Sequence, residues 1–432
     1  MSIILKYYFF VFYVESRYMT KIEIKEWLAK GNLIFISGVL FAFSLPFGKI
    51  FVPPFIGLFL LSVIISPGFG HIAYKGLTKI YLLLFSCFYL LHVAGLIWTE
   101  NFQYALSDLE IKASLIIFPI LFLFSPEKYF NSRFVKGITF SFFTGCFISV
   151  LISFCFAFNL YSKTSDICSF YYSTSSYFMH TSYLSLYIVF ALFALYTKKY
   201  RPSSLFYIFY VIALILVFYL NLLSSKAGFI TFVISMVFIT TEIIIKKEWK
   251  NIVIYVVVPI LVFGGSIFFF PVSTSRLQTA VETINTSQQE LNATGESTAD
   301  RLLIWKAALE LSKNNLIIGT GTGDVKDELI KAYNEKGLKY PAQYKLNAHN
   351  QFINSLVTLG LPAMLLLISL LIIPLWYSIR AKNWLYFAFV TFFAFNIMVE
   401  SMLEVQAGIV FFSLWNCLLW IDMRKSNGTA NT

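Results

Sequence analysis

Two basic residues and one histidine in the second half of the chain have the types and positions that chemistry on an anionic substrate requires. Arg301 lies within a long polar segment, residues 272–348, and His349 follows that segment directly. Lys226 lies in Ser-Ser-Lys-Ala-Gly, a short connection between two apolar stretches. Guanidinium and ammonium groups neutralise anionic oxygens, and a neutral imidazole accepts a proton near neutral pH. We therefore predict an anion-binding site with Arg301 as a cation and His349 as general base.

Structural interpretations of these residues stay open at this point. Arg301 or Lys226 could extend from the hydrophobic layer to lipid headgroups, and a single histidine is often interfacial. Charged groups near an apolar layer are nevertheless expensive and frequently functional. Further candidates near the same surface are Arg276, His180, Tyr183, Asn350, Glu400 and Glu404. Among these, the two glutamates could orient the cations, and either Asn347 or Asn350 could cap a helix start.

The composition of the chain indicates a helical membrane protein. Of its 432 residues, 58% are hydrophobic and 13% are charged, whereas a soluble protein carries about a quarter charged residues. The mean hydropathy is +0.74. The 5 cysteines lie mostly in apolar stretches without ligand spacing, so we expect neither a disulfide framework nor a metal site. The predicted fold class is all-α, a polytopic membrane protein.

The apolar segments predict about twelve transmembrane helices, each of which needs about 20 residues to cross. They are residues 33–47, 50–66, 77–97, 112–125, 135–160, 179–197, 204–223, 226–245, 251–271, 350–379, 384–400 and 405–422. The first and fourth segments are short, and the fourth contains Pro119.

The distribution of lysine and arginine predicts which connections face the cytoplasm. Basic residues gather in the N-terminal segment, in the C-terminal tail and in alternate connections, whereas the remaining short connections hold only Lys49, Lys112, Lys163 and Lys226. By the positive-inside rule both termini are cytoplasmic and residues 272–348 face outward. The net charge of +11 is then a signal of topology, so we expect membrane lipids as partners and no nucleic acid.

These segments divide the chain into five parts. We predict a cytoplasmic N-terminal segment (1–32), transmembrane helices 1–9 (33–271), a large outer loop (272–348), transmembrane helices 10–12 (349–422) and a cytoplasmic tail (423–432). The apolar residues 3–14 are too short to span, and no cleavage site follows them, so we predict no signal peptide. Met19 is an alternative start.

The outer loop contains two predicted short helices joined by a glycine-rich turn. A helix begins at Ser297-Thr-Ala-Asp and continues to Leu311, with Arg301 in its first turn and on the same face as Trp305. A second helix spans residues 324–336. The turn between them, Gly319-Thr-Gly-Thr-Gly, follows a helix rather than a strand and so is not a nucleotide-binding loop. We predict a flexible turn whose backbone amides could contact an anion.

The order of these motifs resembles the O-antigen ligase and polymerase superfamily of bacterial inner-membrane glycosyltransferases. The resemblance rests on Arg301 with Trp305, the glycine-rich turn, and His349-Asn350 followed after nine residues by Gly360. It extends to the number of spans, the large loop before the last three helices, and Ser-Lys-Ala-Gly where many relatives have Ser-Arg-Gly. Two departures are Lys226 in place of arginine and Ala363 in place of a second glycine.

The resemblance implies transfer of a glycan from undecaprenyl pyrophosphate to an acceptor hydroxyl on the periplasmic side of the inner membrane. It implies no metal and no other cofactor. Arg301 and His349 would be catalytic, Lys226, Arg301 and Arg276 would bind the pyrophosphate, and Asn350, His180, Tyr183 and Glu404 would support them. The loop layout favours a ligase, whose acceptor is lipid A–core.

Two alternatives stay open on the sequence. A polymerase of the same superfamily would use another lipid-linked glycan as acceptor. A transporter or flippase of lipid-linked glycans would explain the many spans, but it predicts internal repeats and polar groups near the midplane. The sequence has no clear repeat, and the centres of its spans are nearly free of charge.

Overall fold

The computed structural model describes residues 31–197, 206–269 and 297–426, and these residues form an all-helical fold without strands. The predicted all-α polytopic class is therefore confirmed. The first half of the fold contains α3 (Asn32–Ser44), α4 (Gly48–Ile64), α5 (Gly76–Ala94), α6 (Phe102–Lys112), α7 (Ser114–Leu123), α8 (Ser132–Thr164) and α9 (Thr181–Tyr196). The second half contains α10 (Phe206–Leu222), α11 (Lys226–Lys246), α12 (Val258–Phe269), α15 (Ser297–Asn314), α16 (Val325–Glu335), α17 (Lys339–Gln343), α18 (Gln351–Arg380), α19 (Trp384–Val399) and α20 (Gln406–Ser426).

Within the described residues, seven helical stretches are long and apolar enough to cross a membrane. They are Asn32–Ile64, Gly76–Trp98, Ser132–Thr164, Lys226–Lys246, Trp249–Phe268, Gln351–Arg380 and Gln406–Ser426. The apolar helices Thr181–Tyr196, Phe206–Leu222 and Trp384–Val399 are shorter. Each apolar segment predicted from the sequence is helical in the structure. The number of stretches long and apolar enough to cross a membrane, seven, is smaller than the twelve predicted spans.

The stretch Asn32–Ile64 turns back on itself, in agreement with two separate predicted segments, 33–47 and 50–66. Gly48 has φ 74° and ψ −169°, a conformation that a residue with a Cβ rarely adopts. Gly48 also packs closely against the backbone of Phe178. A Cβ at position 48 would lie only 2.4 Å from the carbonyl oxygen of Phe178, so a larger residue would clash. Ser37 on α3 and Ser62 on α4 are hydrogen-bonded at 2.7 Å across the resulting hairpin.

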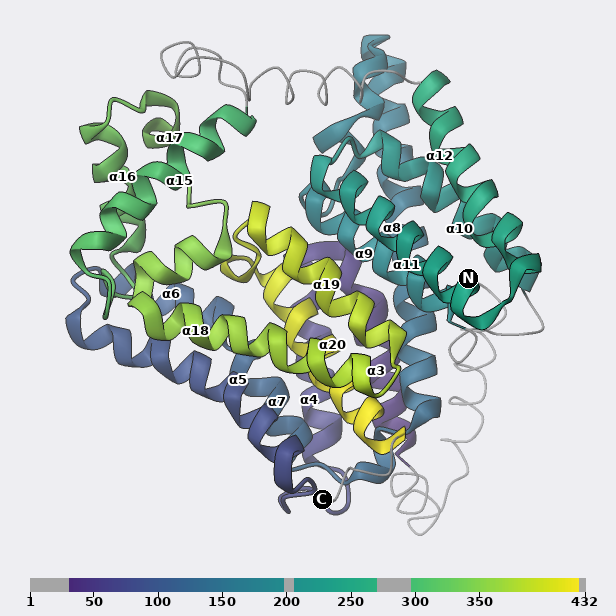
Figure 1. Cartoon of the computed structure of the whole chain (residues 1–432), viewed down its shortest axis with the longest axis horizontal. Coiled ribbons are helices and arrows are strands. Elements are labelled where there is room, and N and C mark those ends of the chain that lie inside the picture. Colours follow the sequence, from purple (N-terminus) through teal and green to yellow (C-terminus); the bar gives the residue numbers. More distant parts are fainter. Residues whose placement is uncertain (1–30, 198–205, 270–296, 427–432) are drawn as a thin grey trace.

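Helices α15, α16 and α17 belong to the segment predicted to face outward and are called the outer helices here. They lie together at one end of the molecule, away from α10 and α12 (Figure 1). They have a small apolar core of their own, formed by Leu303, Ile304, Ala307, Ala308, Val325, Leu329, Tyr333, Leu338, Ala348 and Val357. Val357 belongs to α18, so this core joins the outer helices to the membrane domain. The predicted helix from Ser297 corresponds to α15, and the predicted helix over residues 324–336 corresponds to α16.

Helix α18 is broken one-third of the way along, and the glycine-rich turn occupies the break. Leu359 and Gly360 have non-helical backbone angles, with Gly360 at φ 69°. The carbonyls of Val357 and Thr358, which lose their helical partners there, accept hydrogen bonds from the amides of Thr320 (2.8 Å) and Gly321 (2.9 Å). An unpaired buried carbonyl would be costly, so these bonds stabilise the break.

The prediction of a flexible glycine-rich turn is therefore wrong. Its amides are used inside the protein: besides the bonds to α18, Gly323 N donates to Thr99 Oγ1 at 3.2 Å. The side chain of Asp324 then accepts from the amides of Glu100 (2.9 Å) and Asn101 (2.7 Å) at the start of α6. The glycines are needed because the backbones approach closely; a Cβ on Gly319 would lie 2.4 Å from Thr358 O.

Candidate active site

Glu400 links the two residues that the sequence proposed as catalytic. Its Oε1 lies 2.9 Å from His349 Nδ1, and its Oε2 accepts a hydrogen bond of 3.3 Å from an Nη of Arg301. The three residues come from separate parts of the fold: Arg301 from α15, His349 from the turn before α18, and Glu400 from the turn after α19. His349 and Arg301 are each 23% exposed and Glu400 only 11%, so the carboxylate lies beneath two accessible side chains.

The electrostatics of the cluster determine which nitrogen of His349 carries a proton. Burial alone would raise the pKa of Glu400, but the hydrogen bond from His349 and the positive charges of His349, Arg301 and His180 outweigh burial and lower it. Glu400 is therefore ionised near neutral pH and can only accept hydrogen bonds. His349 Nδ1 must then be the donor, which leaves Nε2 of the neutral ring as a proton acceptor.

The backbone of His349 adopts an unusual conformation just before α18. His349 has φ 44°, in the left-handed region that few residues other than glycine adopt. Its amide donates to Asn347 Oδ1 at 2.9 Å, and Asn350 caps α18 by accepting from the amides of Phe352 and Ile353. Of the two residues predicted as possible caps, Asn350 caps α18, whereas Asn347 accepts from His349; Asn350 is thus a structural neighbour of the site.

Arg301 is held by the small outer core. Leu303 and Ile304, in the same turn of α15, are buried in that core together with Val357 of α18. The guanidinium therefore projects from the side of α15 that faces the membrane domain, where it meets Glu400. A guanidinium has five N–H donors, so Arg301 can bind Glu400 and a substrate anion at the same time.

Glu404 belongs to a neighbouring cluster that sequence reasoning missed. Its Oε2 accepts from Lys112 Nζ at 2.6 Å and its Oε1 from Gln351 Nε2 at 2.8 Å. Lys112 also bonds Asp108 of α6, and both residues are buried. The i,i+4 spacing of Asp108 and Lys112 was the available signal. From the sequence, Lys112 is only a basic residue in a connection predicted to face outward.

Lys226 lines a small pocket whose lining does not include Arg301, His349 or Glu400. It begins α11 and lines a small pocket with Asn221, Ser224, Ser225, Phe229 and residues of α12. Arg276, the other proposed cation, lies outside the described residues. Three cations were predicted to share one site. The structure joins Arg301 to His349 through Glu400, whereas Lys226 lines the separate small pocket.

His180 and Tyr183 lie on the side of the site formed by α9. His180 caps this helix through Nδ1, which accepts from Ser182 N at 3.3 Å, and its Nε2 is 3.4 Å from the hydroxyl of Tyr172. Its ring also meets that of Tyr183 edge-on, with centroids 6.3 Å apart. His180 is exposed and lies close enough to Glu400 to influence its pKa, whereas Tyr183 is buried.

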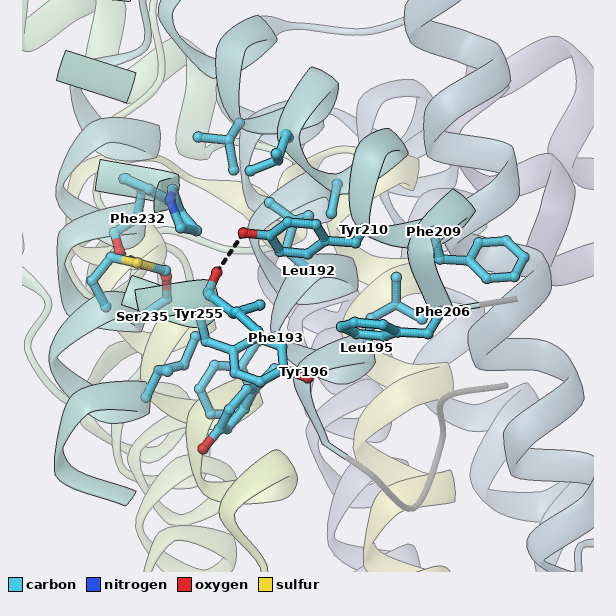
Figure 2. A pocket seen from close by; sticks show the side chains of 17 residues that line it. Leu192, Phe193, Leu195, Tyr196, Phe206, Phe209, Tyr210, Phe232, Ser235 and Tyr255 are labelled. Atoms are coloured by element: carbon cyan, nitrogen blue, oxygen red, sulfur yellow. Dashed lines mark hydrogen bonds between the residues drawn. The ribbon is translucent and has the colours of Figure 1, made fainter. Parts of the chain in front are cut away.

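A mainly apolar pocket in the described part of the chain is lined by none of these charged residues. It lies among α9, α10, α11 and the start of α12, and Figure 2 shows its lining of aromatic and aliphatic side chains. Its one hydrogen bond drawn in Figure 2 joins the hydroxyl of Tyr210 to the carbonyl of Ile254 at 2.7 Å. Such a lining cannot neutralise an anion, so the pocket does not compete with the Glu400 cluster as the reactive centre. Across the described residues, no three His, Cys, Asp or Glu side chains gather closely enough to hold a metal ion.

Comparison with known proteins assigns the central part of the chain to a family. Residues 211–368 match the family model described as O-antigen ligase. That region contains Lys226, Arg301, His349 and the break in α18, and it ends before Glu400 and Glu404. No curated protein matches the chain. This match, together with the helical membrane fold, supports membership of the chain in the O-antigen ligase superfamily.

Proposed function

We propose that the protein transfers a glycan from undecaprenyl pyrophosphate to an acceptor hydroxyl at the periplasmic face of the bacterial inner membrane. The single observation that carries the proposal is the Glu400 carboxylate, which joins a proton acceptor, His349, to a cation, Arg301. The family match supports glycan transfer of the ligase or polymerase type. Such a reaction needs a base for the acceptor and positive charge for the departing pyrophosphate.

His349 is the proposed general base. Nε2 accepts the proton of the acceptor hydroxyl while the hydroxyl oxygen bonds to the anomeric carbon of the donor glycan. Glu400, bonded to Nδ1–H, holds the ring in the required tautomer and stabilises the positive charge that develops on it. General-base catalysis contributes about 100- to 10,000-fold to a rate.

Arg301 is the proposed partner of the leaving group. The bond between the anomeric carbon and the pyrophosphate oxygen breaks with both electrons on oxygen, so negative charge increases there. A guanidinium already oriented by Glu400 stabilises this charge with little reorganisation. Lys226 and Arg276 are proposed as further contacts to the pyrophosphate, which is long enough to meet more than one cation.

The proposed acceptor is lipid A–core, which makes the protein an O-antigen ligase. A polymerase would use the same cluster with another lipid-linked glycan as acceptor. The positive-inside pattern supports cytoplasmic termini and a periplasmic site, because Arg301 and His349 adjoin a loop that is predicted to face outward.

Complementation of a ligase-null host tests the proposal. Wild type, His349→Ala and Arg301→Ala are produced at matched membrane levels, and outer-membrane lipid A–core is analysed for attached polysaccharide. We expect attachment with wild type and its loss in both variants. Long lipid-linked glycan without attachment would identify a polymerase. An unchanged product with His349→Ala would remove this residue from the mechanism. Should the host supply the wrong donor, purified protein with its own lipid-linked glycan separates transfer from transport.

A further inference from the structure

The two short segments that carry His349 and Glu400 are joined at a second place, through Gln351. This residue lies two positions beyond His349 in the first turn of α18 and is only 1% exposed. Its Oε1 accepts a hydrogen bond from Leu403 N at 2.8 Å, and its Nε2 donates to Glu404 Oε1 at 2.8 Å. Together with the bond between His349 and Glu400, these contacts close a ring between residues 349–351 and residues 400–404.

Glu404 is itself held from behind by a buried cation. Lys112 is 1% exposed and donates to Glu404 Oε2 at 2.6 Å, while Gln351 occupies the other carboxylate oxygen. Removing one partner from a buried charge pair leaves the other charge uncompensated, so rotation of Glu404 away from Lys112 is unfavourable. These two partners also fix the orientation of the Gln351 side-chain amide. The Glu404 carboxylate can only accept, so it faces Nε2, and the backbone N–H of Leu403 can only donate, so it faces Oε1.

We propose that Gln351 is a positioning residue that sets the location of Glu400 relative to His349, with Glu404 and Lys112 as its anchor. Glu400 lies in the turn between the end of α19 and η8 (Met402–Glu404), and Gln351 is the side chain that ties this turn to the start of α18. Misplacement of a catalytic group by about 1 Å can cost roughly 100-fold in rate. The expected effect of Gln351 on the transfer rate rests on the proposed function, whereas its effect on the position of Glu400 does not.

An exchange of the two side chains tests this role. Gln351→Glu keeps the length of the side chain but puts a second carboxylate against Glu404, so we expect the ring to open. Adding Glu404→Gln restores the pattern: the new amide can donate to position 351 while its oxygen accepts from Lys112. The net charge of the pair is unchanged. Recovery in the double variant is expected only if the complementary hydrogen bonds matter.

Histidine side-chain NMR on the full chain in lipid nanodiscs reads the result without any substrate. The chain has 4 histidines, so His349 is assigned by its loss in His349→Gln. Wild type and the double variant should show a His349 Nδ1–H bonded to a carboxylate. Gln351→Glu and Gln351→Met should lose that signal. Gln343→Met changes an exposed glutamine of α17 and serves as the matched control, which should keep it.

The transfer rate is then measured on the same proteins. We expect Gln351→Glu to be about 10- to 100-fold slower than wild type, with most of the rate regained in the double variant. A Gln351→Met protein that kept the His349 signal would overturn the positioning role of Gln351, even if wild type transferred glycan. If the expected NMR pattern is seen but wild type transfers no glycan, the positioning role is supported and the proposed function is rejected. Gln351→Asn, one methylene shorter, provides the milder test if the other variants fail to fold, and it should weaken the signal.

Discussion

Glu400 Oε1 and His349 Nδ1 lie 2.9 Å apart although 51 positions separate the two residues in the chain. The contact joins the end of one membrane helix to the beginning of another, and it extends to Arg301 on an outer helix. A carboxylate that holds an imidazole and a guanidinium together is suited to general-base catalysis beside an anionic leaving group. Each prediction below follows from this relationship or from the elements that hold it.

Removing the charge of Glu400 should impair turnover more than folding. Glu400→Gln keeps the size of the side chain, but its amide no longer stabilises a positive His349 and no longer orients Arg301 by charge. We expect kcat for glycan transfer to fall at least about tenfold. Steady-state kinetics on purified protein measure this effect, with Glu335→Gln on the exposed end of α16 as control. Normal kcat in Glu400→Gln would exclude Glu400 from the proposed mechanism.

The shape of Arg301 should matter as well as its charge. Arg301→Lys keeps one positive charge but loses the planar fork that can bind Glu400 and a substrate oxygen together. We therefore expect the rate order wild type, then Arg301→Lys, then Arg301→Ala, with a loss of at least about tenfold at each step. Transfer rates at saturating acceptor give the order. Equal rates for the lysine and alanine variants would show that charge at this position does not contribute.

The buried charges behind the site should make stability depend on pH. Burial would raise the pKa of Glu404, but the charge of Lys112 and the hydrogen bonds from Lys112 and Gln351 outweigh it and lower the pKa to about 2. A lowered pKa stabilises the folded protein above the ordinary value of 4.5, and this stability is lost as pH falls toward 2. Nearby Asp108 opposes this trend, because burial raises its pKa to about 7 despite the charge of Lys112.

Thermal unfolding in detergent between pH 7 and pH 3 measures the contribution of Glu404. The transition temperature of wild type should fall more steeply below about pH 5 than that of Glu404→Gln, which has no such proton to gain. Glu335→Gln, at an exposed position, should follow wild type. Parallel curves for wild type and Glu404→Gln would show that Glu404 has no lowered pKa in the folded protein.

The break in α18 should tolerate only glycine at position 360. Gly360 has φ 69°, and a Cβ there would lie 2.2 Å from the carbonyl oxygen of Ile317. We expect Gly360→Ala to destabilise the protein by at least about 1–2 kcal/mol, from the backbone conformation alone. Gly57→Ala in α4 is the matched control, because an added Cβ there meets nothing within 4 Å. Thermal unfolding compares the two variants, and equal stability would show that the turn can move away.

The fold class could be predicted from the sequence, and so could the choice of Arg301 and His349, the two residues that the structure joins through Glu400. Apolar segments long enough for helices define the membrane domain because no other backbone structure satisfies its hydrogen bonds there except a closed barrel. Arg301 and His349 stood out because charged and titratable side chains are rare in such a chain. The start of α15 at Ser297 and the cap by Asn350 followed from local backbone chemistry, which needs only neighbouring residues.

Only the tertiary structure decided how these residues meet. Glu400 was one of two glutamates in the last outward turn, and nothing in their spacing showed that one would bond His349 while the other bonded Lys112. The glycine-rich turn looked flexible because glycine permits many conformations, and the carbonyls of the broken α18 that occupy its amides are more than thirty positions away. Pairing between distant segments depends on how helices pack, and local sequence patterns carry no measure of that packing.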